Sequence, residues 1–248
     1  MNHDDALLRE LNIYPLWLRR DVQVEAPPVA VAPPQPAPPE PEMKRTAAPP
    51  APAAIQPSPY ADLGWSELKQ KVTDCTACKL RPTCTQTVFG VGDEQADWMI
   101  VGEGPGADED IKGEPFVGQA GKLLDNMLAA IKLKRGDNVY IGNIVKCRPP
   151  GNRTPEPDEI AQCLPYLRRQ IELIRPKLIV ALGKTAATSL LGRDAALGSL
   201  RGHLHEFDGI PLIITYHPAY LLRSPTEKAK AWQDLCLAVA TLQGMAEQ

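Results

Sequence analysis

The hydrophobic positions of this chain recur with two different periods, and each period predicts a different element. Four short apolar runs, bounded by Gly, Pro or polar residues, predict buried strands over residues 98–101, 139–145, 178–182 and 211–215. Apolar residues at helical spacing predict helices over residues 62–72, 121–133, 160–174, 184–191 and 226–242. Strands that alternate with helices are typical of a parallel sheet covered on both faces. We therefore expect an α/β protein with a three-layer α/β/α fold and a central four-stranded, mainly parallel sheet.

The first 61 residues differ in composition from the rest of the chain. Residues 1–21 form a short amphipathic segment, and residues 22–61 hold 13 of the 26 prolines. A segment rich in Pro and Ala cannot bury a core, so we expect an extended, semi-rigid linker there. The folded domain then covers residues 62–248. A short apolar peptide on a stiff tether is either a docking motif for a partner or a terminus without function, and composition does not separate the two.

Composition and charge exclude few classes of function. The net charge is −3, which does not indicate a nucleic-acid-binding protein, although basic residues cluster locally at Lys146, Arg148 and Arg153. The chain has no run of 18 apolar residues, and its acidic start, MNHDDALLRE, is unlike a signal peptide. We therefore expect a cytoplasmic protein without a membrane segment. Six cysteines in that compartment favour metal ligands or free thiols over disulfides.

The most informative stretch is residues 98–121, where a predicted strand runs into a loop that contains Gly102, Gly104 and Gly106. A strand that feeds a tight Gly/Pro loop is where an open α/β sheet binds its ligand. A single Gly-x-Gly is more often an ordinary turn between a strand and a helix. Here a second glycine-framed turn presents Phe116, and four acids follow the strand, namely Glu103, Asp108, Glu109 and Asp110. The glycine loop, the acids and the aromatic turn together favour a functional site.

Two polar residues at the ends of other predicted strands extend this argument. Asn143 is an amide in an otherwise apolar strand, and His217 follows the fourth strand. A buried amide must find a partner or cost a few kcal/mol. Taken singly, each residue is explained more simply by a structural hydrogen bond. Asn143, His217 and Glu103 all belong to strand ends on one edge of the predicted sheet, so we expect them to share one crevice.

Four of the six cysteines form two pairs. Cys75 and Cys78 are separated by two residues, and Cys147 ends the second strand while Cys163 lies on the helix that follows. Four such thiolates hold either zinc or a [4Fe–4S] cluster, and the spacing alone slightly favours zinc. Buried thiols without a metal are the alternative. Cys84 and Cys236 have no comparable mate and are interpreted as core thiols.

These motifs resemble those of the family 4 uracil-DNA glycosylases over roughly residues 62–243. The resemblance rests on the loop from Gly102 to Gly106 with Glu109-Asp110, on Pro115-Phe116-Val117-Gly118, on the run from Asn143 to Pro150, and on His217-Pro218-Ala219. The four paired cysteines match the [4Fe–4S] ligands of that family in order and setting, which implies a [4Fe–4S] cluster in place of zinc. A related branch becomes covalently linked to DNA and carries a basic insert after the second strand. Residues 151–155 have no such insert, which implies ordinary turnover.

The resemblance implies an enzyme that excises uracil from DNA and so initiates base excision repair, on double-stranded and single-stranded substrates. Hydrolysis of the N-glycosidic bond requires the base to be flipped out of the stack. Phe116 would stack on the flipped uracil, and the Asn143 amide would pair with its N3–H and O4. His217 would hydrogen-bond O2 as negative charge develops on the leaving group.

The resemblance also implies roles for the acids and the glycines. Glu103 is the acid that we expect to position the water or to stabilise the positive sugar. Glu109 or Asp110 would share that work or exclude the methyl group of thymine. Backbone N–H groups of the loop would bind the base edge or a phosphate; the glycines concerned are Gly102, Gly104 and Gly106.

DNA contacts are implied for two further segments. Leu221, Leu222 and Arg223 would wedge into the minor groove and hold the gap open. Arg148 and Arg153 would contact phosphates from a loop that the cluster orders, so the role implied for the cluster is structural.

The N-terminal segment has a resemblance of its own. Leu11-Asn12-Ile13 and Trp17-Leu18-Arg19-Arg20 are similar to the peptide by which the psi subunit of bacterial DNA polymerase III holds its chi partner. This similarity implies that residues 1–21 dock on the clamp loader, in the bacterial cytosol close to the nucleoid, while the protein itself is expected to be a monomer. Two other functions stay open, namely a non-catalytic iron–sulfur DNA-binding module and an adaptor that acts mainly through its tail.

Overall fold

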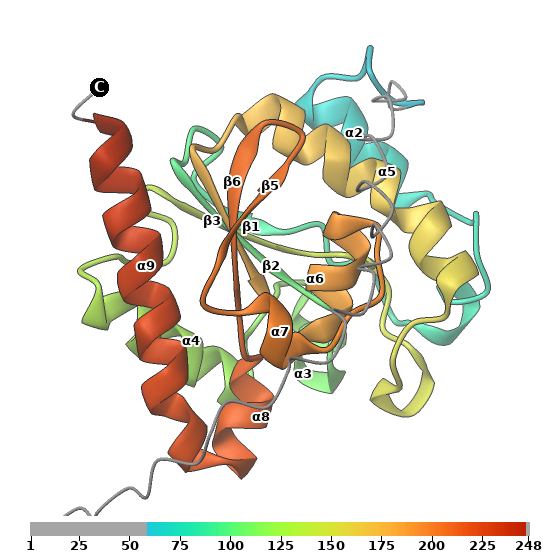
Figure 1. Cartoon of the computed structure of the whole chain (residues 1–248). Helices are drawn as coiled ribbons and strands as arrows, with labels where there is room; N and C mark the ends of the chain where they lie inside the picture. Colours follow the sequence, from blue (N-terminus) through green and yellow to red (C-terminus); the bar gives the residue numbers. More distant parts are fainter. Residues whose placement is uncertain (1–58, 247–248) are drawn as a thin grey trace, which may run out of the picture. The chain divides into compact units, whose positions relative to one another are not determined.

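A computed structural model describes residues 59–246, which form one six-stranded sheet with helices on both faces (Figure 1). The strand order is β1-β3-β2-β4-β6-β5. The four central strands are mutually parallel and are β3 (Val139–Asn143), β2 (Trp98–Gly102), β4 (Leu178–Leu182) and β6 (Ile210–Thr215). The antiparallel edges are β1 (Val91–Gly92) and β5 (Leu204–Phe207). The α/β fold and its parallel central strands are therefore confirmed, whereas the sheet has six strands in place of the four predicted.

The two edge strands escape a search for apolar runs for a physical reason. β1 is only two residues long, and β5 is a polar-rich strand in which Leu204 is 55% exposed and only Phe207 is buried. Edge strands meet solvent on one side, so they need not carry the continuous hydrophobic run that marks the central strands.

The core consists of two apolar clusters, one on each face of the sheet. Every residue of β2, β3 and β4 is buried, and alternate side chains point to opposite faces. Met99 and Val101 belong to the cluster under α2 (Trp65–Thr73), α5 (Pro157–Ile174), α6 (Lys184–Leu191) and α7 (Leu197–Leu200). Trp98 and Ile100 belong to the cluster under α4 (Gln119–Ala130) and α9 (Lys228–Ala246). This is the three-layer arrangement, with α4 and α9 on the side of the sheet opposite to α2 and α5 (Figure 1).

The helices largely match their predicted positions, and the differences lie at ends and in short elements. The first described helix begins at Trp65 with Gly64 as N-cap, where the sequence had suggested Asp62; the Gly64 N–H donates to the Glu67 carboxylate over 2.9 Å. Short helices were not predicted because six residues or fewer show no clear period. The elements concerned are α3 (Ala107–Lys112), α7, α8 (Pro218–Arg223) and the 3-10 turns Arg81–Thr83, Pro150–Asn152 and Pro225–Glu227.

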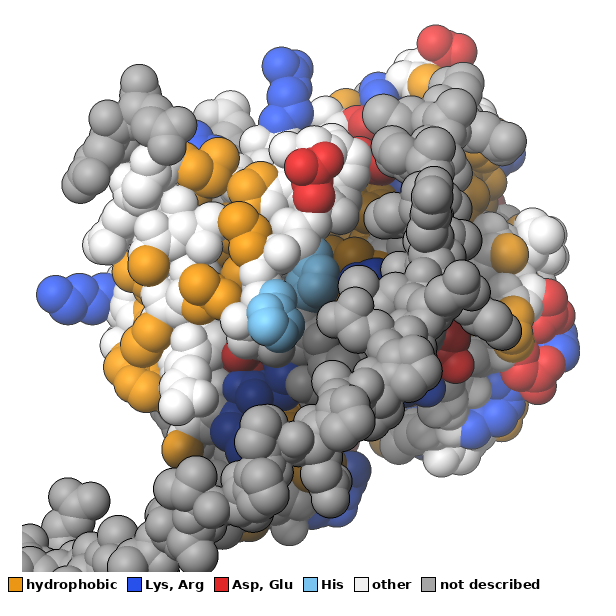
Figure 2. All heavy atoms as spheres, in the orientation of Figure 1, with side chains coloured by type: hydrophobic (Ala, Val, Ile, Leu, Met, Phe, Trp, Pro, Cys, Tyr) orange, Lys and Arg blue, Asp and Glu red, His pale blue; other side chains and the backbone are white. Residues whose placement is uncertain are grey.

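The predicted docking peptide and nearly all of the predicted linker lie outside the described residues. Within residues 59–246 no helix combines the length and the apolar character needed to cross a membrane. Hydrophobic side chains gather over α9 on the face seen in Figure 2, with few charges among them. On this helix Trp232 is 47% exposed.

Candidate active site

A cleft of about 940 Å³ opens at the carboxyl ends of the parallel strands. The register of β2 and β3 pairs Gly102 with Asn143, and β6 ends two residues before His217. The cleft is lined by Glu103, Phe116 and His217, together with parts of the glycine loop, α6 and α8. The structure thus brings together the strand-end residues that the sequence placed on one edge of the sheet.

Asn143 and Phe116 meet above Gly102 near the floor of the cleft, which Phe116 lines and the buried Asn143 does not. A methyl group on Gly102 would lie 2.4 Å from Asn143 Oδ1 and 2.6 Å from Phe116 Cζ, so only glycine leaves room for both side chains. Asn143 is 2% exposed, and its Oδ1 has no hydrogen-bond partner within the described part of the chain. Because a buried acceptor without a donor costs about 1–3 kcal/mol, this oxygen is suited to receive an N–H from a ligand.

His217 is a neutral hydrogen-bond donor beside that floor. Burial, followed by the nearby Arg223, lowers the pKa of His217 from 6.5 to about 4. Its Nδ1 accepts a hydrogen bond from the Ala219 N–H over 3.1 Å, which places the ring proton on Nε2. The ring stacks on Phe116 with centroids 5.5 Å apart and an interplanar angle of 30°. His217 therefore offers an N–H without a positive charge.

The acids near the glycine loop have three different environments. Glu103 lines the cleft and accepts a hydrogen bond from Thr185 Oγ1. Glu109 also lines the cleft, but its carboxylate accepts the N–H groups of Gly106, Val117 and Gly118 over 3.1, 2.9 and 3.2 Å. Glu109 is therefore fully engaged in bracing two loops.

Asp110 faces away from the cleft. It is 4% exposed, and its carboxylate accepts the backbone N–H and the hydroxyl of Thr85, each over 2.9 Å. The suggestion that Asp110 shares catalytic work does not fit this position, because its oxygens hold the segment after Thr83. The acids that line the cleft are Glu103, Asp108 and Glu109, and of these Glu103 directly follows β2.

Thr185 is a site residue that the sequence reasoning missed. It lies in the first turn of α6, directly after β4, and its hydroxyl holds Glu103. The signal was present, since the carboxyl ends of all parallel strands meet at one edge. The sequence Gly183-Lys184-Thr185 follows the third predicted strand, so the same rule puts Thr185 at the edge that carries Glu103 and His217.

The predicted DNA wedge is divided between exposed and buried residues. Leu222 is 45% exposed and Tyr220 is 38% exposed, while Arg223 lines the cleft. Leu221 is only 1% exposed, since it points inward from α8. A role for Leu221 in DNA contact does not fit its burial, and Tyr220 presents the exposed ring in its place.

The four paired cysteines line one small cavity beneath α5 and the segment after α2. Cys147 and Cys163 are buried, and the backbone N–H of Lys146 donates to Cys163 Sγ over 3.2 Å, a contact that stabilises a thiolate. Cys84 is also buried but does not line this cavity. In the described range 59–246, no three cysteine, histidine or carboxylate side chains are grouped closely enough to share a single metal ion.

Lys146 links the cysteine cavity to the floor of the cleft. Its side chain is buried, and Nζ donates to the Asn143 carbonyl over 2.9 Å and to Gln170 Oε1 over 2.6 Å. Burial lowers the pKa of Lys146 to about 8. Gln170 in turn donates to the Phe89 carbonyl and to the Tyr140 hydroxyl over 2.9 and 3.1 Å. The end of β3 is thus held by a buried polar network.

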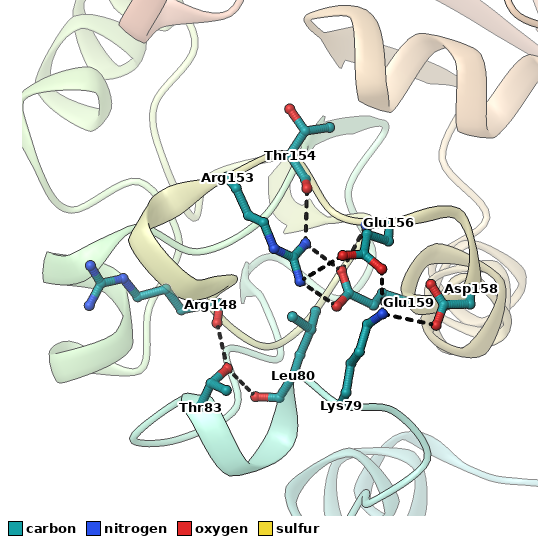
Figure 3. Close-up of polar contacts among 9 residues, drawn as sticks. All are labelled: Lys79, Leu80, Thr83, Arg148, Arg153, Thr154, Glu156, Asp158 and Glu159. Carbon is teal, nitrogen blue, oxygen red and sulfur yellow. Dashed lines mark hydrogen bonds and ion pairs between the residues drawn. The ribbon is translucent and has the colours of Figure 1, made fainter.

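A second network joins the segment that follows Cys78 to the loop that bears Arg148 and Arg153 (Figure 3). Lys79 pairs with Glu156 and, over 3.5 Å, with Asp158. Thr83 Oγ1 donates to the Arg148 carbonyl over 3.4 Å.

The two arginines of that loop are held differently. Both terminal nitrogens of Arg153 donate to the buried Glu159 carboxylate, over 2.8 and 2.7 Å, so Arg153 serves mainly to hold the loop. Arg148 bonds through Nε to Asn152 over 2.7 Å, and its guanidinium points away from the network (Figure 3). Arg148 therefore has the less engaged guanidinium, whereas of the two only Arg153 lines the cleft.

Comparison with known proteins agrees with the site. The profile of the Uracil DNA glycosylase superfamily matches residues 89–236. A type-4 uracil-DNA glycosylase from Archaeoglobus fulgidus is 46% identical over 167 residues, which are 64% of this chain and 83% of the relative. Type-4 enzymes from Pyrobaculum aerophilum (43% over 179 residues, 69% of this chain and 91% of the relative) and Thermotoga maritima (44% over 165 residues, 66% and 85%) are similarly related. With this profile match and these relatives, the chain belongs to the type-4 family of the uracil-DNA glycosylase superfamily.

Proposed function

We propose that this protein excises uracil from DNA by hydrolysing the N-glycosidic bond of a flipped-out deoxyuridine, which leaves an abasic site and initiates base excision repair. The observation that carries the proposal is the buried Oδ1 of Asn143 beside the Phe116 ring, an oxygen that has no hydrogen-bond partner among residues 59–246. Uracil carries an N–H at N3 that donates to this oxygen, and its O4 accepts from the amide nitrogen. Cytosine has an unprotonated N3 and an amino group at C4, so it would leave the amide unsatisfied at both atoms.

The leaving group is stabilised by His217 in this proposal. Departing uracil develops negative charge at O2, and a neutral Nε2–H directed at that oxygen strengthens its hydrogen bond as the charge grows. Removing one such donor typically costs about 3–4 kcal/mol of transition-state stabilisation. A neutral histidine also avoids tight binding of the released uracil anion.

Glu103 is the acid proposed to meet the reacting sugar. Its carboxylate positions the attacking water or stabilises positive charge on the sugar, and the Thr185 hydroxyl fixes its orientation. Glu109 acts indirectly, because its carboxylate holds the turn that carries Phe116.

DNA is held around the cleft by groups on two sides. Arg148 is proposed to neutralise a phosphate, and Leu222 with Tyr220 to fill the gap that the flipped nucleotide leaves. Arg223 lies at the rim between them. Filling the gap matters on a duplex and not on a single strand, where the base is already unpaired.

The proposed cofactor is a [4Fe–4S] cluster held by Cys75, Cys78, Cys147 and Cys163. The shared cavity, the burial of Cys147 and Cys163, and the N–H donated to Cys163 support this donor set. A four-iron cluster takes four thiolate ligands, which matches the number of cysteines that line this cavity. When bound, such a cluster supplies a rigid link between the segments that carry its ligands.

The central test is a glycosylase assay on oligonucleotides with uracil opposite guanine, opposite adenine and in a single strand. Alkali-sensitive abasic sites are expected at the uracil in all three, with unmodified strands and strands containing cytosine at that position left intact. If purified, iron-replete protein leaves all three uracil strands intact, the proposal is refuted.

A second function is proposed for the tail, on the sequence similarity described above. Residues 1–21 would dock on the chi subunit of the clamp loader, and a monomeric enzyme in the bacterial cytosol would thereby work where DNA is copied. Calorimetric titration of chi with a peptide of residues 1–25 tests this, and absence of binding removes the proposal without touching uracil excision.

A further inference from the structure

Phe116 holds its ring in the cleft from an unfavourable backbone conformation. Its φ is 56°, in the left-handed region that non-glycine residues seldom adopt, and its side chain is 6% exposed. Strained backbone persists only where surrounding contacts fix it, and it recurs at ligand-binding sites. The contacts that fix Phe116 are therefore candidates for a role in the reaction.

Two side chains of opposite charge hold the turn from Pro115 to Gly118. Arg135 donates through Nη1 to the Pro115 carbonyl over 2.8 Å and through Nη2 to the Phe116 carbonyl over 2.7 Å. The Glu109 carboxylate accepts the next two N–H groups along the chain. The carbonyls on one side of the turn and the N–H groups on the other are thus satisfied by charged partners, and hydrogen bonds to charged groups are stronger than neutral ones.

Arg135 is itself fixed, and α4 leaves little space around the turn. The Nε of Arg135 donates to Asp125 of α4 over 3.0 Å, and the Arg135 side chain is 22% exposed. A methyl group on Gly121 would lie 1.8 Å from the Phe116 carbonyl oxygen. That oxygen therefore packs directly against α4 while it accepts from Arg135, and the peptide plane after Phe116 has one available orientation.

We propose that Arg135 is a positioning residue for uracil excision, which acts through Phe116 by fixing the strained turn so that the ring is ready to stack on the flipped base. This rests on the proposed function. Arg135 has no place among the residues that line the cleft. Its hydrogen bonds to the Pro115 and Phe116 carbonyls are the contacts through which we infer that it affects the reaction.

The test compares Arg135→Ala with a matched arginine-to-alanine substitution elsewhere in the chain. Both are made in the full-length protein, and the iron content of each preparation is verified. Arg169 offers the match, because its Nε and Nη2 donate to the Leu63 carbonyl over 2.9 and 2.8 Å and its Nη1 pairs with Glu172. Neither Arg169 nor Leu63 lines the cleft. Arg135→Ala is expected to slow single-turnover excision about 10–100-fold. Arg169→Ala is expected to lose about as much thermal stability as Arg135→Ala and yet to stay within about threefold of the wild-type excision rate. Both variants are expected to bind uracil-free duplex DNA as tightly as wild type, as measured by fluorescence anisotropy.

A double-mutant cycle with Phe116→Ala shows whether Arg135 acts through the ring. If it does, Arg135→Ala in the Phe116→Ala background costs little further rate, since the group that it positions is gone. If the double variant instead loses rate by the product of the two single-variant factors, the proposal is overturned. A rate for Arg135→Ala within about threefold of wild type would also overturn it.

Two further measurements keep the proposal testable on its own. Arg135→Met keeps an apolar stem but has no N–H donor, and if Arg135→Ala does not fold, a wild-type rate in folded Arg135→Met overturns the proposal. Binding of 5-fluorouracil, followed by the ¹⁹F shift that the Phe116 ring current produces, is expected to weaken in Arg135→Met and not in Arg169→Ala. A wild-type protein with no uracil excision would instead refute the proposed function, a distinct outcome.

Discussion

Asn143 keeps its amide oxygen buried and unpartnered among the described residues, an arrangement that folded proteins ordinarily avoid. The unsatisfied oxygen costs free energy in the free protein, and that cost is removed when a ligand N–H donates to it. Asn143→Ala removes the unsatisfied acceptor together with the recognition group. We expect excision to fall by at least about a hundredfold, as when a site loses its polar contact to a substrate.

The stability of Asn143→Ala separates recognition from folding. Relief of the unpartnered oxygen offsets the small cavity left behind, so the midpoint of thermal unfolding is expected to change by no more than a few degrees. A large fall in that midpoint would mean that the amide is structural. Single-turnover assays and thermal melts on the same preparations make the comparison.

The protonation of His217 predicts an unusual pH dependence. Its pKa is about 4 in the folded protein against 6.5 ordinarily, so the ring stays neutral down to pH 5. The excision rate is therefore expected to show no loss with a midpoint near 6.5, and a loss there would contradict a neutral donor. The stabilisation linked to this group is fully present above pH 6.5 and is lost as the pH falls toward 4, because the unfolded chain takes up the proton more readily. Single-turnover rates and unfolding midpoints between pH 5 and 8 test both statements.

Within α8 two neighbouring leucines have different environments, which gives an internal comparison. Leu221 is 1% exposed and Leu222 is 45% exposed. Leu221→Ala is expected to lower the free energy of unfolding by about 2–4 kcal/mol through the cavity that it leaves.

Leu222→Ala is expected to leave stability almost unchanged and to slow excision from duplex DNA more than from single strands, since only a duplex needs its gap filled. Chemical denaturation and paired single-turnover assays measure these effects. Equal slowing on both substrates by Leu222→Ala would argue against a wedge.

At the level of elements, the sequence allowed the central sheet and most of the cleft to be predicted. Parallel strands buried on both faces read as apolar runs, and their carboxyl ends carry Glu103, Asn143 and His217. What escaped prediction depends on tertiary placement. Packing between distant segments has no local period in the sequence. It determines that the Asp110 carboxylate accepts from Thr85, that Leu221 is buried, and that Arg135 donates to the Phe116 carbonyl.

For the whole molecule, the four cysteines that line the cavity and the buried Cys84 outside it predict different effects of substitution on iron content. Cys163→Ser removes a thiolate from the cavity, and the protein is expected to lose the brown colour and the iron of a [4Fe–4S] cluster. Cys84→Ser alters a buried thiol outside that cavity and is expected to retain both. Iron analysis and visible absorbance of the purified variants distinguish them. Full loss of iron in Cys84→Ser would reassign the ligands.

The short run from Asn143 to Cys147 has a consequence for how the enzyme matures. A base-reading amide and a proposed cluster ligand stand four residues apart, at most about 14 Å along the chain, and Lys146 ties the first of them to the core. Loss of the proposed cluster would therefore act close to the base-reading amide. A chain that has not received iron keeps the hydrogen bonds of Lys146 to Asn143 and Gln170 but lacks the proposed anchor at Cys147. We expect such a molecule to excise uracil more slowly than the iron-replete protein, so that repair activity follows the iron supply.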